Sequence, residues 1–204
     1  MSTEEQKAPS VNLQRRKILT GATGVVGATG ATFLAVPFVS SWQPSERAKA
    51  AGAPVNADVS KLLPGQMLTV EWRGKPVWVV RRTPEMVNGL APLTEELRDP
   101  DSEESIQPSY CQNESRAIES EYLVVVGICT HLGCAPLYRP AIGSPDVGAD
   151  WQGGFFCPCH GSRFDLAGRV FQSVPAPTNL DIPPHHYLTD SIIRIGEDAK
   201  EGEV

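Results

Sequence analysis

Residues 129–134 read CTHLGC, and residues 157–162 read CPCHGS. Each stretch contains one cysteine and one histidine at short spacing, C-x-H in the first and C-x-x-H in the second. Each stretch also contains one further cysteine. Thiolates and imidazoles are ligands for zinc, iron and other transition metals, so the two stretches together predict a metal centre. The candidate ligands are Cys129, His131, Cys157 and His160.

Two kinds of metal site use this ligand set. In a Rieske 2Fe–2S cluster, two imidazoles replace two thiolates on one of the two irons. Structural zinc also accepts two cysteines and two histidines, but zinc fingers usually pair Cys with Cys and His with His. Both arms are mixed here and contain Gly or Pro. The mixed arms favour the iron–sulfur cluster over zinc, and over a framework held by disulfides alone.

With these two motifs the chain resembles the Rieske iron–sulfur subunit of bacterial ubiquinol–cytochrome c reductase, the respiratory cytochrome bc complex. The resemblance covers nearly the whole chain. It includes a basic N-terminus, one apolar span, the two ligand motifs, and the later segment Val174-Pro175-Ala176-Pro177. The resemblance implies one Rieske 2Fe–2S cluster as the cofactor.

The resemblance also assigns roles to the ligands. It implies that Cys129 and Cys157 bind the buried iron, while His131 and His160 bind the outer iron. The remaining cysteines of the motifs, Cys134 and Cys159, are then free to form a disulfide that joins the two loops.

Two further positions bear on the redox potential. The family uses a serine hydroxyl, here Ser162, as a hydrogen-bond donor to a bridging sulfide. Its second donor is a tyrosine, and Phe164 occupies that position in this chain. Because hydrogen bonds to the sulfurs raise the potential, we expect a lower potential than in tyrosine-containing relatives.

By the same resemblance the chain is the electron-transfer subunit of a quinol–cytochrome c reductase. The cluster would take one electron, with a coupled proton, from ubiquinol and pass the electron to a c-type cytochrome subunit. His160 and His131 would serve this reaction, and Leu132 would help His160 to dock at the quinol site. Implied partners are cytochrome b, the c-type cytochrome and the lipid bilayer, in a dimeric complex. The alternative is the Rieske subunit of a periplasmic molybdenum oxidoreductase such as arsenite oxidase.

The N-terminus predicts membrane attachment. Residues 1–17 are polar and end in Arg15-Arg16-Lys17, and no charged residue follows before Glu46. A helix over residues 18–40 is about 34 Å long at about 1.5 Å per residue, enough to cross a hydrocarbon core of about 30 Å. The paired arginines resemble a twin-arginine export signal. We therefore expect a cytoplasmic N-terminus, a retained anchor in the bacterial inner membrane and a periplasmic head.

The remaining chain predicts a mainly β head. Residues 41–60 are expected to form a flexible neck, and residues 61–204 a Rieske domain with a cluster-binding subdomain at about 128–178. The fold expected is an antiparallel β-sandwich. A short helix is expected at Pro84–Leu90, after Thr83. Expected strands are Gln66–Trp72 and Pro76–Arg82 as a hairpin, then Glu121–Gly127, Gly154–Phe156, Arg163–Phe171 and Ser191–Ile195.

Several other features are assigned no role in the chemistry. Residues 135–156 are expected to form a surface loop, and the acidic residues 95–104 a solvated one. We expect His185 and His186 to be exposed and unligated, and Cys111 to be a free surface thiol. The net charge of −6 argues against nucleic-acid binding, because the basic cluster lies before the membrane span.

Overall fold

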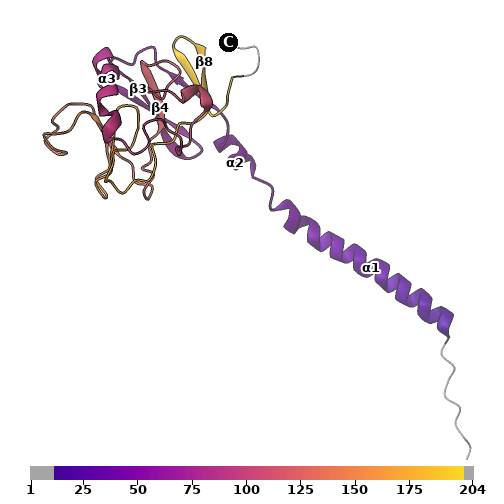
Figure 1. Cartoon of the computed structure of the whole chain (residues 1–204). Coiled ribbons are helices and arrows are strands. Elements are labelled where there is room, and N and C mark those ends of the chain that lie inside the picture. Colours follow the sequence, from indigo (N-terminus) through magenta and orange to yellow (C-terminus); the bar gives the residue numbers. More distant parts are fainter. Residues whose placement is uncertain (1–11, 200–204) are drawn as a thin grey trace, which may run out of the picture. The chain divides into compact units, whose positions relative to one another are not determined.

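The computed structural model describes residues 12–199, and the chain divides into two units between Lys49 and Ala50. In the first unit, α1 (Leu13–Ser40) is one continuous helix (Figure 1). Among the described residues it is the helix that is long and apolar enough to cross a membrane. The expected span 18–40 lies within it, whereas residues 1–11 of the expected N-terminal segment lie outside the described residues.

Two threonines of α1, Thr29 and Thr32, have their hydroxyls satisfied within the helix. The hydroxyl of Thr29 donates to the carbonyl of Val25, and that of Thr32 to the carbonyl of Ala28, each at 2.9 Å. Such internal bonds matter in hydrocarbon, where no water is present to hydrogen-bond a polar group. The small polar residues of α1 are therefore compatible with a membrane span.

The second unit contains the strands, all paired antiparallel. Their order defines three sheets, β1-β9-β8, β2-β3-β4 and β5-β6-β7. The third sheet is inserted in the sequence between β4 and β8. The antiparallel β architecture expected from the sequence is thus confirmed. The strands are β1 (Val55–Asp58), β2 (Met67–Trp72), β3 (Lys75–Arg81), β4 (Tyr122–Val126), β5 (Leu137–Arg139), β6 (Gly154–Phe156), β7 (Arg163–Phe164), β8 (His185–Thr189) and β9 (Ile192–Ile195).

In the β2-β3-β4 sheet, strands β3 and β4 are buried on both faces. Successive strand residues point to opposite faces, so Val77 and Val79 of β3 pack with Ile193 of β9 in one core. The alternate residue Trp78 packs in a second core with Phe155 of the inserted sheet, and their rings stack at 5.3 Å. A strand buried on both sides needs apolar residues at every position. This explains the continuous apolar run of β4.

The hairpin between β2 and β3 turns at Arg73 and Gly74. Both residues have positive φ, 53° and 70°, as a two-residue type I′ turn requires. The turn matches the right-handed twist of the flanking strands, and it sets Trp72 opposite Lys75. The hairpin position expected from the sequence is confirmed.

Short helices complete the head. Thr83 caps the helix expected after it, because its side chain accepts the backbone N–H of Met86 at 3.3 Å. This helix ends at Asn88, slightly before the expected end. The helices besides α1 are α2 (Glu46–Ala51), α3 (Pro84–Asn88), η1 (Ala91–Glu96) and η2 (Ser109–Cys111).

The expected neck, residues 41–60, differs from the structure in its second half. Residues Val55–Asp58 form β1, which pairs with β9 along its whole length. Ala57 and Val59 are almost completely buried. Alanine and valine pack well on a sheet that has apolar neighbours, so the low apolar content of this stretch was misleading. The head begins before residue 61.

Two other expected segments also differ. Residues 135–156 contain β5 and β6, and the indole of Trp151 is buried and donates to the carbonyl of Arg139 at 2.8 Å. The stretch is therefore a folded segment with two strands and a buried tryptophan, not a simple surface loop. The expected strand 163–171 is interrupted after Phe164 by a turn, and the chain returns to bridge Phe164 with Val170.

His185 and His186 are buried, which corrects the expectation that they are exposed. The His185 ring donates through Nδ1 to the carbonyl of Pro183 at 2.8 Å. Its backbone N–H donates to the hydroxyl of Tyr110 at 2.9 Å. These contacts fix the first residue of β8 inside the head.

The burial of His185 predicts acid sensitivity. Burial lowers the pKa of His185 in the folded state, so the unfolded chain binds the proton more readily. Its stabilising contribution is present above the unfolded pKa of about 6.5 and is lost as the pH falls below that value. One such group changes the unfolding free energy by at most about 1.4 kcal/mol per pH unit.

We expect His185→Gln to flatten the loss of stability between about pH 7 and pH 5. Denaturant unfolding of the purified chain at several pH values measures this slope for the wild type and the variant. Equal slopes in the two proteins would contradict a buried, neutral His185.

Candidate metal centre

The two ligand loops, residues 129–134 and 157–162, have the same backbone hydrogen bonds. In the first loop, the N–H of the opening cysteine donates to the carbonyl of the last residue at 2.8 Å, and the N–H of Gly133 donates back at 3.0 Å. In the second loop the corresponding distances are 2.8 Å and 2.9 Å, with Gly161 as the fifth residue. The site is therefore built from two copies of one turn.

The shared glycine has a steric reason. Gly133 has φ 84° and Gly161 has φ 77°, a left-handed conformation that residues with a Cβ adopt at a cost. The first residue of each turn, Cys129 or Cys157, is held at the buried end. The common sequence C-x-x-x-G is the signal of this repeated turn.

The thiols and the imidazoles lie on different sides of the paired loops. Cys129 and Cys157 are each 2% exposed, form no disulfide, and belong to the same buried core. The rings of His131 and His160 lie 4.8 Å apart between centroids, nearly perpendicular, on the exposed side. The four predicted ligand residues therefore lie in the two paired loops, with both cysteines buried and the two histidine rings beside each other.

The remaining cysteines of the loops, Cys134 and Cys159, form a disulfide with an S–S distance of 2.13 Å. The expected pairing is confirmed. The sulfur of Cys157 lies within 4.8 Å of both disulfide sulfurs. This group of three sulfurs is not a metal site of its own, because two of them are bonded to each other and cannot be thiolates.

The inner end of the site suits a metal with thiolate ligands. Burial raises the pKa of the Cys129 thiol, while a hydrogen bond from Ser162 acts in the opposite direction. Two adjacent buried thiolates are unfavourable unless a cation neutralises them. The four donors therefore fit a site with two sulfur and two nitrogen ligands, and their chemistry alone admits zinc as well as an iron–sulfur cluster.

A third segment closes the site. We call Val174–Pro177 the proline loop. The buried N–H of Ala176 donates to the Ser162 hydroxyl at 3.1 Å, and the hydroxyl of Thr130 donates to the carbonyl of Thr178 at 2.7 Å. The proline loop is thereby joined to the second ligand loop, and Thr178, which directly follows it, is joined to the first.

Two apolar residues near the ligands differ in exposure. Phe164 is completely buried in the core that also contains the two free inner cysteines. Leu132, beside His131 in the first loop, is 72% exposed. An exposed leucine next to the half-buried His131 gives the outer face of the site an apolar contact surface.

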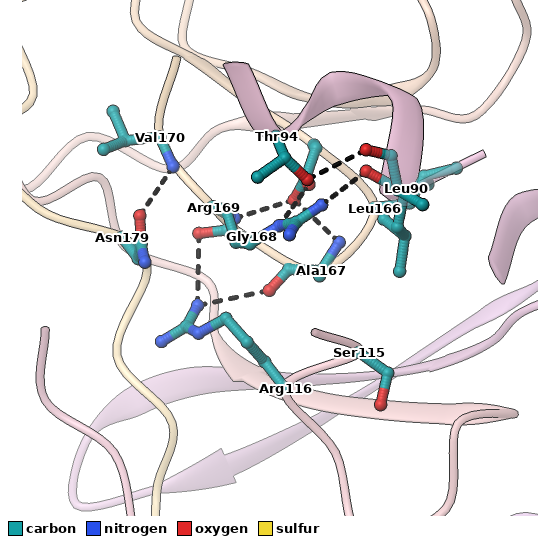
Figure 2. A network of polar contacts seen from close by, with 12 residues as sticks. Leu90, Thr94, Ser115, Arg116, Leu166, Ala167, Gly168, Arg169, Val170 and Asn179 are labelled. Carbon is teal, nitrogen blue, oxygen red and sulfur yellow. Dashed lines mark hydrogen bonds and ion pairs between the residues drawn. The ribbon is translucent and has the colours of Figure 1, made fainter. Parts of the chain in front are cut away.

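Behind the second loop lies a network of buried charges that the sequence did not reveal. Asp165 and Arg169 form an ion pair at 2.7 Å, with both side chains at most 1% exposed. Arg116 donates to the carbonyls of Ala167 and Gly168 at 3.1 and 3.2 Å (Figure 2). These contacts hold the turn 165–170, which returns the chain from the second ligand loop toward the proline loop.

Arg116 keeps its charge despite its burial. Burial lowers the pKa of Arg116 to about 10, so the guanidinium remains cationic at neutral pH. A third contact runs to the carbonyl of Leu180 at 2.9 Å. In the same turn, the N–H of Val170 donates to the side chain of Asn179 at 2.7 Å (Figure 2).

Cys111 and the acidic stretch also differ from expectation. Cys111 forms no disulfide, as expected, but it is completely buried in the core, not on the surface. Burial raises the pKa of its thiol to about 11. In the stretch 95–104, Asp99 is buried and accepts the N–H of Glu103 at 2.8 Å. These residues are therefore part of the fold.

Comparisons with known proteins place these features in a family. A family described as "Rieske [2Fe-2S] domain" matches residues 53–184, and one described as "Ubiquitinol-cytochrome C reductase Fe-S subunit TAT signal" matches residues 5–45.

Full-length relatives share most of the chain. The ubiquinol-cytochrome c reductase iron-sulfur subunit of Allochromatium vinosum is 63% identical over 191 residues, covering 94% of this chain and 92% of the relative. That of Bradyrhizobium diazoefficiens is 40% identical, covering 89% and 94%. A solved chain described as "Hyperthermophilic respiratory Complex III" is 29% identical, covers 86% of this chain and 98% of its own length, and has a TM-score of 0.47.

Proposed function

The chain belongs to the family of ubiquinol–cytochrome c reductase iron–sulfur subunits, and from this premise we propose that Cys129, His131, Cys157 and His160 ligate its Rieske 2Fe–2S cluster. The observation that carries the proposal is the repeated turn, which directs two thiols inward and two imidazoles outward. A cluster ligated in this way supplies a one-electron acceptor with a higher potential than an all-cysteine cluster.

The chain is a subunit of complex III, and the exposed face suggests how it meets its electron donor. His160 is exposed, so a ring nitrogen that binds no iron could accept a hydrogen bond from the hydroxyl of ubiquinol. His131 supplies the second imidazole of this face, and Leu132 supplies an apolar contact. In this proposal the His160 imidazole would accept the quinol proton, and the bound cluster would supply the acceptor for one electron, whose destination is the c-type cytochrome.

The other parts of the site keep the ligands in place. The disulfide between Cys134 and Cys159 joins the two loops near their ends, so the turns cannot separate without breaking it. The proline loop covers the buried hydroxyl of Ser162. Together these contacts exclude water from the inner sulfurs. Solvent exposure of a cluster alters its redox potential, so a Rieske-type potential requires this exclusion.

The N-terminal segment combines a membrane-anchor helix with a Tat-signal region, so the subunit is membrane-associated. We propose that residues 1–17 lie in the cytoplasm, that residues 18–40 cross the inner membrane, and that the head lies in the periplasm. The disulfide supports this side of the membrane, because such bonds persist in oxidising compartments. Residues 41–54 would tether the head, which meets cytochrome b and the c-type cytochrome within a dimeric complex.

Electron spin resonance of dithionite- or ascorbate-reduced membranes tests the proposal. We expect the spectrum of a reduced 2Fe–2S cluster with nitrogen ligands, and we expect it to change when a quinol-site inhibitor is added. Iron and acid-labile sulfide should be present in equal amounts. A protein that carries zinc without sulfide would contradict the ligand assignment.

The buried Phe164 leads to a prediction about the potential. We expect Phe164→Tyr to raise the midpoint potential, because the added hydroxyl can donate a hydrogen bond to a cysteine sulfur and stabilise the reduced, more negative cluster. A hydrogen bond worth about 1 kcal/mol corresponds to about 40 mV for a one-electron couple. Redox titration of membranes measures the shift.

The control is Phe156→Tyr, which adds the same hydroxyl to the residue directly before Cys157, at a partly exposed position of β6. It should leave the potential nearly unchanged. A Phe164→Tyr protein with a full cluster and an unchanged potential would show that no sulfur lies within reach of the new hydroxyl.

A further inference from the structure

The proline loop is held from two opposite directions. From the ligand side, the Ser162 hydroxyl accepts the N–H of Ala176 at 3.1 Å. From the other side, the guanidinium of Arg98 donates to the carbonyl of Ala176 at 3.0 Å and to that of Val174 at 3.2 Å. Arg98 therefore binds the same residue whose N–H contacts the serine.

The backbone around Arg98 is fixed independently of this contact. The N–H of Arg98 donates to the carbonyl of Val170 at 3.0 Å, and the preceding Leu97 forms a bridge with Phe171. The following residue, Asp99, is buried and receives the hydroxyl of Ser105 at 2.6 Å. The arginine thus extends from an anchored segment, which is the acidic stretch that the sequence suggested was only solvated.

The guanidinium is suited to this contact. It is planar and presents several N–H donors in a fixed arrangement, so one side chain can bind two carbonyls of the loop at once. Two bonds restrict both the position and the tilt of the Val174–Ala176 peptides. The N–H of Ala176 is thereby kept directed at Ser162.

This contact determines what the serine hydroxyl can do. A hydroxyl has one proton to donate and lone pairs to accept with. Because the oxygen of Ser162 accepts the N–H of Ala176, its proton stays available to donate, and the acceptor that we propose for it is one of the inner sulfurs. Hydrogen bonds of this kind at the sulfurs raise the potential of the cluster.

We propose that Arg98 is a positioning residue for the redox centre: by clamping the proline loop, it keeps the Ser162 hydroxyl aligned with the sulfurs and so raises the midpoint potential. The inference rests on the ligand assignment proposed above. Arg98 touches neither the ligands nor the outer face of the site among the contacts of the described residues, so its influence runs through Ala176 and Ser162. The positive charge of Arg98 also favours the reduced cluster directly. The experiment must therefore separate this effect of charge from the effect of positioning.

A double-mutant cycle on the whole complex in membranes makes that separation. The variants are Arg98→Gln, Ser162→Ala and the two combined, each titrated for midpoint potential by electron spin resonance. We expect Ser162→Ala to lower the reduction equilibrium constant about tenfold, which is about 59 mV for a one-electron couple. Arg98→Gln should lower it by a smaller factor, and clearly less in the Ser162→Ala background than in the wild type.

The control is Arg139→Gln, which removes one positive charge from β5. Arg139 pairs with Asp146 at 2.7 Å, and none of its contacts reaches the proline loop. Its effect on the potential should be the same in both backgrounds, because charge acts without the hydroxyl. If Arg98→Gln also shifts the potential equally in both backgrounds, or does not shift it, the positioning role is wrong.

Failure of the positioning role and failure of the proposed function give different results. A wild-type complex without a reduced-cluster signal would contradict the ligand assignment, whereas additive shifts in cluster-loaded variants would contradict only the role of Arg98. If the Arg98→Gln protein holds no cluster, Arg98→Lys replaces it in the cycle. The lysine keeps a donor for one carbonyl, and its shift in potential should again be smaller in the Ser162→Ala background than in the wild type.

Discussion

Replacing Cys129 with alanine is expected to abolish the 2Fe–2S cluster completely. The substitution removes one of the two inner sulfurs, so under the proposed ligand assignment the inner iron would keep a single protein ligand, Cys157. A buried site that is 2% exposed offers no water to replace the missing thiolate. We expect no reduced-cluster spectrum and no acid-labile sulfide in the purified protein, and no quinol oxidation by the complex.

The matched control is Cys111→Ala. Cys111 and Cys129 belong to the same hydrophobic core, and neither forms a disulfide, so both substitutions remove one buried sulfur and leave a similar cavity. Burial raises the pKa of the Cys111 thiol to about 11, and Cys111 lies outside both ligand loops. The control should retain full cluster content. A cluster that survives in Cys129→Ala at wild-type occupancy would refute the ligand assignment.

Much of the site could be predicted because its determinants are local in the sequence. The C-x-x-x-G pattern of both loops specifies a turn whose fifth residue, Gly133 or Gly161, must have positive φ. The same holds for the hairpin at Arg73-Gly74 and for the cap that Thr83 provides to α3. In each case the residues that determine the conformation lie within a few positions of each other.

What could not be predicted depends on partners that are distant in sequence. In the sequence, Arg98 is one cation in an acidic stretch. Its role depends on contact with the proline loop, which lies far along the chain. Cys111 and His185 read as polar residues in polar surroundings, although both are covered by strands formed elsewhere. A charged or polar side chain reveals its burial only through the groups that satisfy it, and single-sequence patterns do not identify those groups.

The buried pair Asp165 and Arg169 is the strongest such case. Asp165 accepts the N–H of Ala167 at 2.9 Å, the N–H of Arg169 at 2.8 Å and the guanidinium of Arg169 at 2.7 Å. In Asp165→Asn the amide can still accept the backbone bonds through its oxygen. Its NH2 group, however, would then face the guanidinium of Arg169, which is left as an uncompensated buried charge.

We expect Asp165→Asn to lower the free energy of unfolding by about 3–5 kcal/mol, the usual cost of removing one partner of a buried ion pair. The matched control is Asp146→Asn, whose carboxylate pairs with Arg139 at the same 2.7 Å but is 48% exposed. Solvent screens that pair, so its loss should cost about 0–1 kcal/mol. Denaturant unfolding followed by tryptophan fluorescence measures both. Similar losses in the two variants would mean that Arg169 finds water or another acceptor, and that the turn behind the second ligand loop is not held by its buried charges.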